Sequence, residues 1–293
     1  MRRRPRVVIG IPLYNGGEHL VEAVESLLSQ TYSDFELVMV DDCSTDRTEE
    51  IVSAHAAGDE RIHCSRNETR LGLVGNWRRV FEMAQELHPD LDYFAWGSDH
   101  DIWAPRWLES LVHELDAHPE AVLAYPRMAT ISEAGEMLRR QPRPLDTTGV
   151  DDPWARAALT WSQGGFGYRV YGLYRAQALD RCGVFRDVYL PDRLLLMELV
   201  LHGHYREVPE VLWYRRRTGG ASVTRQRAAF FPQRRVPWRF RVPWFYSHSA
   251  ILLWSLAVRG RARPGVTRRE GVAIAARYLR LGRAHKSKRH AAR

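Results

Sequence analysis

Apolar residues in the first 125 positions follow two alternating spacings. Continuous apolar runs at 7–14 and 35–42 are typical of strands buried on both faces. The segments 19–30 and 46–57 repeat apolar residues every three or four positions, as amphipathic helices do. Strands that alternate with helices in this way predict right-handed βαβ units and a mostly parallel sheet, hence an α/β fold.

The same alternation continues further along the chain. We expect strands at 62–67 and 121–130, a strand that runs into an acidic turn at 92–101, helices at 74–87, 107–117 and 190–203, a loop near 141–153 and a Gly-rich turn at 163–175. Ligands of such sheets bind beyond the carboxyl ends of the strands. The loops 12–17 and 41–46 fall there, which predicts a binding site between them.

Beyond Ser222 the pattern changes, and we divide the chain into a domain at 1–225 and a helical extension at 226–293. The apolar stretch 242–258 contains His248 and three serines. It is shorter than the roughly 20 residues that span a bilayer, so we interpret it as an interfacial helix.

Charge is concentrated in that extension. From Arg225 to Arg293 there are 18 Lys and Arg against the single acid Glu270, a net charge of +17, whereas the whole chain carries +8. The remainder is therefore net negative. Because aromatic residues are interleaved with the charge, we expect the extension to contact an anionic membrane surface, with a solvated basic surface as the alternative.

Cysteine usage and the first residues bear on the compartment. Cys43, Cys64 and Cys182 show no C-x-x-C spacing, so neither a zinc site nor a disulfide framework is indicated. The apolar run near the start is interrupted by Pro12 and Asn15, which favours a first strand over a signal peptide. These features predict a cytoplasmic protein, placed peripherally at the inner face of the plasma membrane by its basic extension.

The acidic turn S-D-H-D at 98–101 is the strongest chemical signal. Asp99 and Asp101, two positions apart at a strand end, can reach one divalent ion or the phosphates that it holds. Any exposed turn can offer this spacing, so a purely structural turn is the alternative. His100 is more typical of a hydrogen-bonded turn residue than of a ligand, since Mg²⁺ and Mn²⁺ prefer oxygen.

Four segments together resemble the family 2 inverting glycosyltransferases of the GT-A fold. They are IPLYN, VMVDDCSTD, RNETRLGLVGNW and YFAWGSDHDIWAPRWLE, in that order. The last is similar to a subgroup that reads Y-F-x-W-x-x-H-D-D-x-x-x-P, although this chain has Asp99, His100 and Asp101 in place of H-D-D. The resemblance covers about residues 6–222. It implies a central, mostly parallel sheet flanked by helices, with the extension appended.

The resemblance also implies site residues. Those for the nucleotide-sugar donor are Pro12, Tyr14, Asn15, Asp41, Arg66, Asn76 and Asp99, and those for a Mn²⁺ or Mg²⁺ ion are Asp101 and Asp99. Asp41 would accept hydrogen bonds from the nucleobase or ribose, and Arg66 would neutralise phosphate. Core packing remains open for Tyr14, and helix capping for Ser44 and Asp46.

The same family has a late His where Thr218 stands here. Whether His100 or an Arg of 215–217 replaces the usual ligand stays open.

An inverting transfer also requires a carboxylate that accepts the proton of the acceptor hydroxyl. The family places it after the Gly-rich turn, at the start of a helix, and Asp192 occupies that position here. Asp187 is the second candidate. The alternative for Asp192 is a carboxylate that complements the helix dipole.

We therefore expect a sugar transferase of cell-envelope polysaccharide synthesis. Its donor would be a UDP-sugar, with GDP and dTDP as alternatives, and its acceptor a glycan or a lipid-linked molecule. A second hypothesis is a protein that binds nucleic acid or another anionic polymer through Trp238, Phe240 and Trp244. It leaves the acidic turn unexplained, so we expect no nucleic-acid partner. A dehydrogenase ranks last, because no G-x-G-x-x-G follows the first strand.

Overall fold

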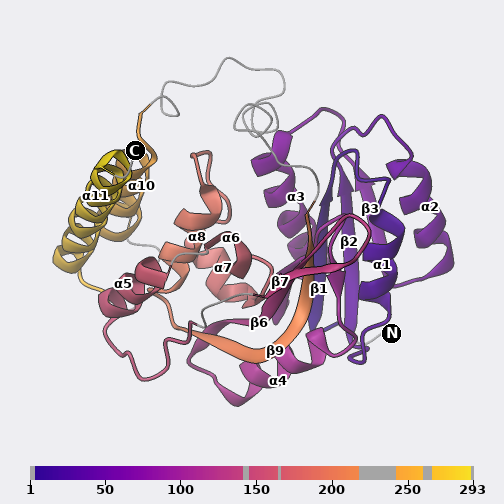
Figure 1. Ribbon diagram of the computed structural model, residues 1–293, viewed down its shortest axis with the longest axis horizontal. Helices are drawn as coiled ribbons and strands as arrows, with labels where there is room; N and C mark the ends of the chain where they lie inside the picture. Colours follow the sequence, from indigo (N-terminus) through magenta and orange to yellow (C-terminus); the bar gives the residue numbers. More distant parts are fainter. Residues whose placement is uncertain (1–3, 141–144, 164–165, 218–241, 260–265, 292–293) are drawn as a thin grey trace.

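The computed structural model describes residues 4–140, 145–163, 166–217, 242–259 and 266–291. Within them, helices flank one mixed sheet, whose main order is β3-β2-β1-β4-β8-β6-β9-β5 with β7 paired to β6 (Figure 1). The strands are β1 (Val7–Leu13), β2 (Phe35–Asp41), β3 (Ile62–Arg66), β4 (Tyr93–Trp96), β5 (Ile102–Trp103), β6 (Ala121–Ile131), β7 (Met137–Arg140), β8 (Leu173–Arg175) and β9 (His204–Arg216). The helices are α1 (Leu20–Leu28), α2 (Thr48–Gly58), α3 (Gly72–Leu87), α4 (Trp107–Ala117), α5 (Pro153–Gln163), α6 (Phe166–Arg169), α7 (Ala176–Cys182), α8 (Pro191–Leu199), α10 (Trp244–Leu253) and α11 (Arg268–Ala291), with a π-helical turn at Trp254–Arg259.

The predicted parallel half of the sheet is confirmed. Strands β1, β2, β3 and β4 pair in parallel, and β1 is almost wholly buried, as its continuous apolar run requires. Helix α3 packs closely on β1 at Gly10, where an added Cβ would lie 2.2 Å from a Val80 methyl group. The segment 92–101 is, as expected, a strand that runs into an acidic turn: β4 ends at Trp96 and the turn follows.

The other half of the sheet is mixed. Strand β8 runs antiparallel to both β4 and β6, whereas β6 and β9 pair in parallel. Short strand β5 then pairs with the end of β9, where Trp103 is opposite Trp213. The long strand β9 thereby returns to the acidic turn. The predicted Gly-rich turn at 163–175 instead contains α6 and β8 in its described part.

The extension supplies two packed helices. A Cβ added at Gly282 would lie 2.3 Å from Phe245, and one added at Gly271 would lie 2.8 Å from Leu256. The second half of α11 thus meets the start of α10, and its beginning meets the turn after α10, so the two helices run antiparallel in close contact. Leu252, Leu256 and Tyr278 are buried in the same core cluster as residues of α3 and α8. One face of the predicted interfacial helix therefore packs on protein.

The structure describes only part of the predicted extension. Its predicted residues Trp238 and Phe240 lie outside the described residues, and the domain division at 225 stays a prediction. In the described part of the chain, no helix is both long and apolar enough to cross a membrane.

Polar contacts join these C-terminal helices to the segment before α8. The ring of His248 makes hydrogen bonds at 2.7 Å from Nε2 to the Tyr189 carbonyl and at 2.9 Å between Nδ1 and the Tyr278 hydroxyl. The guanidinium of Arg193 lies 4.8 Å from the centre of the Trp244 ring. Helix α10 therefore braces the start of α8, where Asp192 is located.

Acid should weaken this contact through His248. Burial lowers the pKa of His248 from 6.5 to about 4, so between these values the unfolded chain binds the proton more readily than the folded one. We expect the free energy of unfolding to fall as the pH drops through that window, with His248 contributing up to about 1.4 kcal/mol per pH unit. Urea unfolding of the parent and of His248→Gln across the window measures it. Equal pH slopes for the two proteins would contradict this assignment.

Candidate functional site

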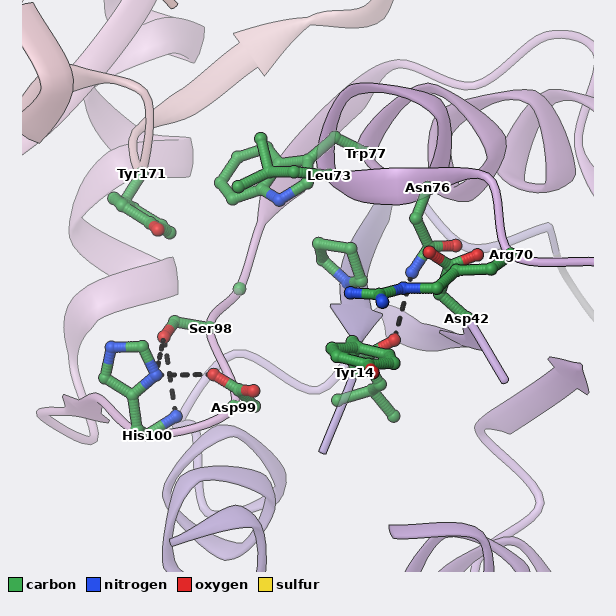
Figure 2. Close-up of a pocket in the computed structure, with 13 residues that line it drawn as sticks. Tyr14, Asp42, Arg70, Leu73, Asn76, Trp77, Ser98, Asp99, His100 and Tyr171 are labelled. Carbon is green, nitrogen blue, oxygen red and sulfur yellow. Dashed lines mark hydrogen bonds and ion pairs between the residues drawn. The ribbon is translucent and has the colours of Figure 1, made fainter. Parts of the chain in front are cut away.

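A pocket of about 280 Å³ opens at the carboxyl ends of β1 and β4 (Figure 2). Its walls come from the loop after β1, the start of α3 and the acidic turn after β4. Pro12, Tyr14, Asn76 and Asp99, all predicted from the sequence, line it. This is the edge at which parallel sheets bind ligands, so the structure brings these four residues together as expected.

One wall is a flat pair of side chains, Tyr14 and Arg70. The Arg70 guanidinium carbon lies 3.6 Å from the centre of the Tyr14 ring, so the two planes stack, as Figure 2 shows. Tyr14 is exposed, which excludes the core-packing alternative. Arg70 Nε is buried and finds no hydrogen-bond partner among the described residues. The stacked pair offers the pocket a flat, positively charged surface, which is suited to a planar ligand.

Arg66, predicted to meet phosphate, lies elsewhere. Its Nη1 donates to Asp41 at 2.6 Å and to Glu49 at 2.8 Å, so two carboxylates already neutralise its charge. The Asp41 carboxylate also accepts the Ser44 backbone N–H at 3.1 Å. Neither Arg66 nor Asp41 lines the pocket. Arg70, which sequence reasoning missed, is the cation at the pocket wall.

Asn15 and Asp46 connect two loops beside the pocket. Asn15 has a positive φ of 51° and accepts the Thr45 backbone N–H at 2.8 Å. Asp46 accepts the N–H groups of Gly17 and Thr48, both at 3.0 Å, which supports its capping interpretation. Asn15 itself does not line the pocket, so it acts on the shape of the loop that presents Tyr14.

The floor of the pocket is held by Asp42 and Asn76. Asp42 accepts the backbone N–H groups of Leu71 at 2.7 Å and Gly72 at 2.8 Å, which fixes the start of α3. The Asn76 amide donates to the Leu13 carbonyl at 3.2 Å and the Val40 carbonyl at 2.9 Å. Asn76 therefore ties the ends of β1 and β2 together, and its predicted contact with the nucleotide would be secondary to this role.

The opposite wall is the acidic turn. Asp99 and His100 both line the pocket, with His100 Nδ1 at 2.5 Å from Asp99 Oδ1. An added Cβ on Gly16 would lie 2.5 Å from Asp99 Oδ2, so only glycine lets this carboxylate approach the loop after β1. Burial opposes protonation of His100, but the hydrogen bond and charge of Asp99 outweigh it and raise its pKa.

Asp101 lies behind that wall, with its Oδ1 3.7 Å from His100 Nε2. Only 1% of it is exposed, and its carboxylate accepts the Arg216 backbone N–H at 2.8 Å and Trp213 Nε1–H at 3.1 Å. Burial raises its pKa. It does not line the pocket, so the predicted ion ligands are not equivalent: Asp99 faces the pocket, and Asp101 anchors the turn to β9.

The arginines near the end of β9 also differ. Arg216 is buried, pairs with Glu22 and donates from Nε to the His100 carbonyl at 2.9 Å, so its side chain supports the turn. Arg215 lies over the Tyr168 ring at 5.2 Å, and its charge acts on both His100 and Asp101. Arg215 therefore contributes positive charge near the acidic turn. Thr218 lies outside the described residues.

Asp192 opens α8 beside α6, where a Cβ added at Gly167 would lie 3.1 Å from Asp192 Oδ2. The preceding Leu190 has a positive φ of 55°, an uncommon conformation for a branched residue, and Pro191 occupies the first turn. Burial raises the pKa of Asp192. Tyr171 lines the pocket, whereas Asp192 does not. Burial raises the pKa of Tyr171, and the charges of Asp101, Asp99 and Asp192 add to this rise. By contrast, Asp187 pairs with Arg78 at 3.3 Å.

The donor atoms at the pocket suit an ion that is shared with a ligand. Among the described residues there is no group of three or more His, Cys, Asp or Glu that could enclose a metal. Asp99 offers one carboxylate at the wall, with His100 beside it. Mg²⁺ in nucleotide sites is commonly held by one or two carboxylates, substrate phosphates and water, and this donor set fits that arrangement.

Sequence comparison relates the chain to sugar transferases. The family model described as "Glycosyl transferase family 2" matches residues 8–183. The putative glycosyltransferase EpsE of Bacillus subtilis is 32% identical over 136 residues, which cover 46% of this chain and 47% of EpsE. The chain spans between 21% and 47% of the length of the curated relatives it matches.

Solved structures share the architecture at low sequence identity. S. aureus TarS 1–349, crystallised with UDP-GlcNAc, is 16% identical with a TM-score of 0.62, and the match covers 94% of this chain and 72% of that one. The mannosyltransferase PcManGT from Pyrobaculum calidifontis, in complex with GDP-Man and Mn²⁺, is 19% identical with a TM-score of 0.54, covering 96% and 76%. These likenesses concern the fold.

Proposed function

Because the chain belongs to glycosyl transferase family 2 and has the predicted GT-A fold, we propose that it transfers a sugar from a nucleoside diphosphate donor. The acceptor is a hydroxyl of a glycan or of a lipid-linked molecule, and the transfer inverts the anomeric centre. One observation carries the proposal: a single pocket places the Tyr14–Arg70 pair opposite Asp99 and His100. Such a pocket can hold the planar base and the charged diphosphate of one molecule.

The donor enters with its base against Tyr14 and Arg70. Stacking on a planar guanidinium suits any base, and its positive charge lies at the pocket wall. We favour a UDP-sugar, since TarS was crystallised with UDP-GlcNAc. A GDP-sugar, as in the PcManGT complex, and a dTDP-sugar are the alternatives.

The diphosphate lies against the acidic turn with Mn²⁺ or Mg²⁺. Asp99 is the protein carboxylate placed to hold the ion, with His100 beside it, whereas Asp101 positions the turn through Trp213 and Arg216. When bound, the ion neutralises charge on the leaving diphosphate. The ion in the PcManGT complex supports a divalent metal for this chain.

Asp192 is the proposed base. Its carboxylate accepts the proton of the acceptor hydroxyl while that oxygen bonds to the anomeric carbon. The nucleoside diphosphate leaves from the opposite face, which gives inversion. Burial raises the pKa of this carboxyl, and a raised pKa makes it a stronger proton acceptor in its ionised form.

The proposed setting is the cytoplasmic face of the plasma membrane, in the synthesis of cell-envelope polysaccharide.

Trp244, one of the residues proposed to stack on nucleic-acid bases in the alternative hypothesis, is not free to do so. The Trp244 ring lies 5.7 Å from that of Trp161 and carries Arg193 at 4.8 Å, so protein side chains already cover it.

The first test concerns the Tyr14–Arg70 pair, on which the nucleobase is proposed to stack. We expect Arg70→Ala to weaken UDP binding at least tenfold, about 1.4 kcal/mol, because it removes the charged plane that stacks on Tyr14. Arg70→Lys keeps the charge without the plane and should recover only part of the loss. Calorimetric titration with UDP measures both. Loss of binding in Arg66→Ala, with Arg70→Ala unaffected, would return the role to Arg66.

The second test separates the two acids of the turn. Asp99→Ala should abolish the gain in nucleotide affinity on adding Mn²⁺ while the melting temperature holds. Asp101→Ala should lower the melting temperature, because it leaves the buried N–H groups of Arg216 and Trp213 without an acceptor. Titration with and without Mn²⁺, and thermal unfolding, are the measurements. A parent enzyme that is indifferent to EDTA would refute metal dependence.

The third test concerns the proposed catalytic base, Asp192. Asp192→Asn keeps the shape of the side chain and removes its basicity, so turnover should fall at least about 100-fold with the donor dissociation constant little changed. Asp187→Asn is the matched control and should remain active. If Asp187→Asn were inactive and Asp192→Asn active, the role would move to Asp187. Activity in both variants would exclude a single base in this segment.

A further inference from the structure

The C-terminal helices expose large apolar side chains. Trp254 and Val258 are 54% and 53% exposed, and Tyr246, Leu253 and Val272 are also exposed. All five belong to α10, the π-helical turn after it, or α11. Single exposed apolar residues are common, but five on two adjoining helices form a patch that water does not favour.

Two of these residues, Tyr246 and Leu253, lie on the outer face of α10. Tyr246, Ala250 and Leu253 follow one another at spacings of four and three residues, which places them on one side of a helix. The opposite side, with Phe245 and Leu252, is buried in the protein. A surface helix of a water-soluble protein usually carries polar residues on its outer face, and α10 does not.

Helix α11 adds charge beside this face. Arg283 Nη2 donates to the Tyr246 hydroxyl at 3.3 Å, so Arg283 lies on the same side of the pair as Tyr246. Val272 precedes Arg283 by eleven residues, just over three full turns, and therefore lies on the same face of α11. Arg268 and Arg269 are exposed in the first turn of the helix. The patch is thus apolar at its centre and basic at its rim.

Acidic groups do not offset this charge. Glu270 is the single acid from Arg225 to Arg293, and its carboxylate accepts the Thr267 backbone N–H at 2.6 Å at the start of α11. The net charge of that stretch is +17. An apolar, aromatic centre with an arginine rim complements a surface that is negatively charged outside and apolar beneath, which describes a bilayer of anionic lipid.

We propose that the outer face of α10 and α11 docks on an anionic lipid bilayer, with Trp254 and Leu253 entering the headgroup boundary. The arginines at the rim contact lipid phosphates. Binding is peripheral, since one face of each helix is packed in the protein core.

The docking surface is connected to the acceptor side of the site. In Figure 1 the α10–α11 pair lies at the edge of the molecule opposite α2, next to α5 and α8. His248 of α10 contacts the Tyr189 carbonyl, three residues before Asp192, and Trp244 contacts Arg193. If the proposed transfer holds, on which this step rests, a lipid-linked acceptor would be presented beside Asp192.

Vesicle sedimentation of the full chain tests the surface. We expect the parent to sediment with vesicles of phosphatidylcholine and phosphatidylglycerol, but not of phosphatidylcholine alone, and to be released by salt. The double variant Leu253→Ser, Trp254→Ser should bind at least about tenfold more weakly. Val21→Ser is the matched control, because Val21 is an exposed apolar residue of α1, and it should bind like the parent.

Other outcomes would overturn the proposal. These are no sedimentation of the parent with anionic vesicles, undiminished sedimentation of the double variant, or a parent dimer that the double variant abolishes without effect on vesicles. The last would assign the face to a second copy of the chain. Arg268→Glu, Arg269→Glu gives an independent test if the double variant is unstable, and it should also lose binding. UDP titration of the same variants should match the parent, so failure of docking is distinct from failure of the donor site.

Discussion

The buried carboxylate of Asp101 is the contact on which the site depends. It accepts hydrogen bonds from Trp213 and from the backbone of Arg216, more than a hundred residues along the chain, and so fastens the acidic turn to β9. A buried carboxylate is costly unless such partners compensate it, which fixes the turn in one conformation. With Asp101 turned inward, Asp99 and His100 face the pocket, and Gly16 leaves room for Asp99 to approach the loop after β1.

A second set of contacts fixes the other side of the pocket. The candidate base Asp192 follows a strained residue, Leu190, and strain of this kind persists only where surrounding structure enforces it. Helix α10 contacts this segment on either side of Asp192, through His248 at Tyr189 and Trp244 at Arg193. The C-terminal helices therefore have two different faces: an inner one that contacts the start of α8 and an outer one that is exposed.

The sequence predicted the first four strands and their helices because their apolar periodicity is local, and the family resemblance added the GT-A fold. It could not predict β5 or β8, which are two and three residues long and exist only through pairing with distant strands. The site residues likewise differ in whether local sequence or distant contacts determine their positions. Asp99 and Asp101 look equivalent in sequence until Trp213 covers one of them. Arg66 and Arg70 stand four residues apart, and only the fold shows that Asp41 and Glu49 already occupy Arg66, which leaves Arg70 at the pocket.

The central claim is that one pocket holds the nucleotide at Tyr14 and Arg70 and its metal at Asp99. A crystal structure with UDP and Mn²⁺, with diffraction data collected to give the anomalous signal of manganese, tests it most directly. The account predicts the uracil ring stacked at the Tyr14–Arg70 pair and a manganese peak within coordination distance of the Asp99 carboxylate and the diphosphate. A nucleotide bound elsewhere, or a manganese peak at Asp101 with Asp99 unligated, would contradict it.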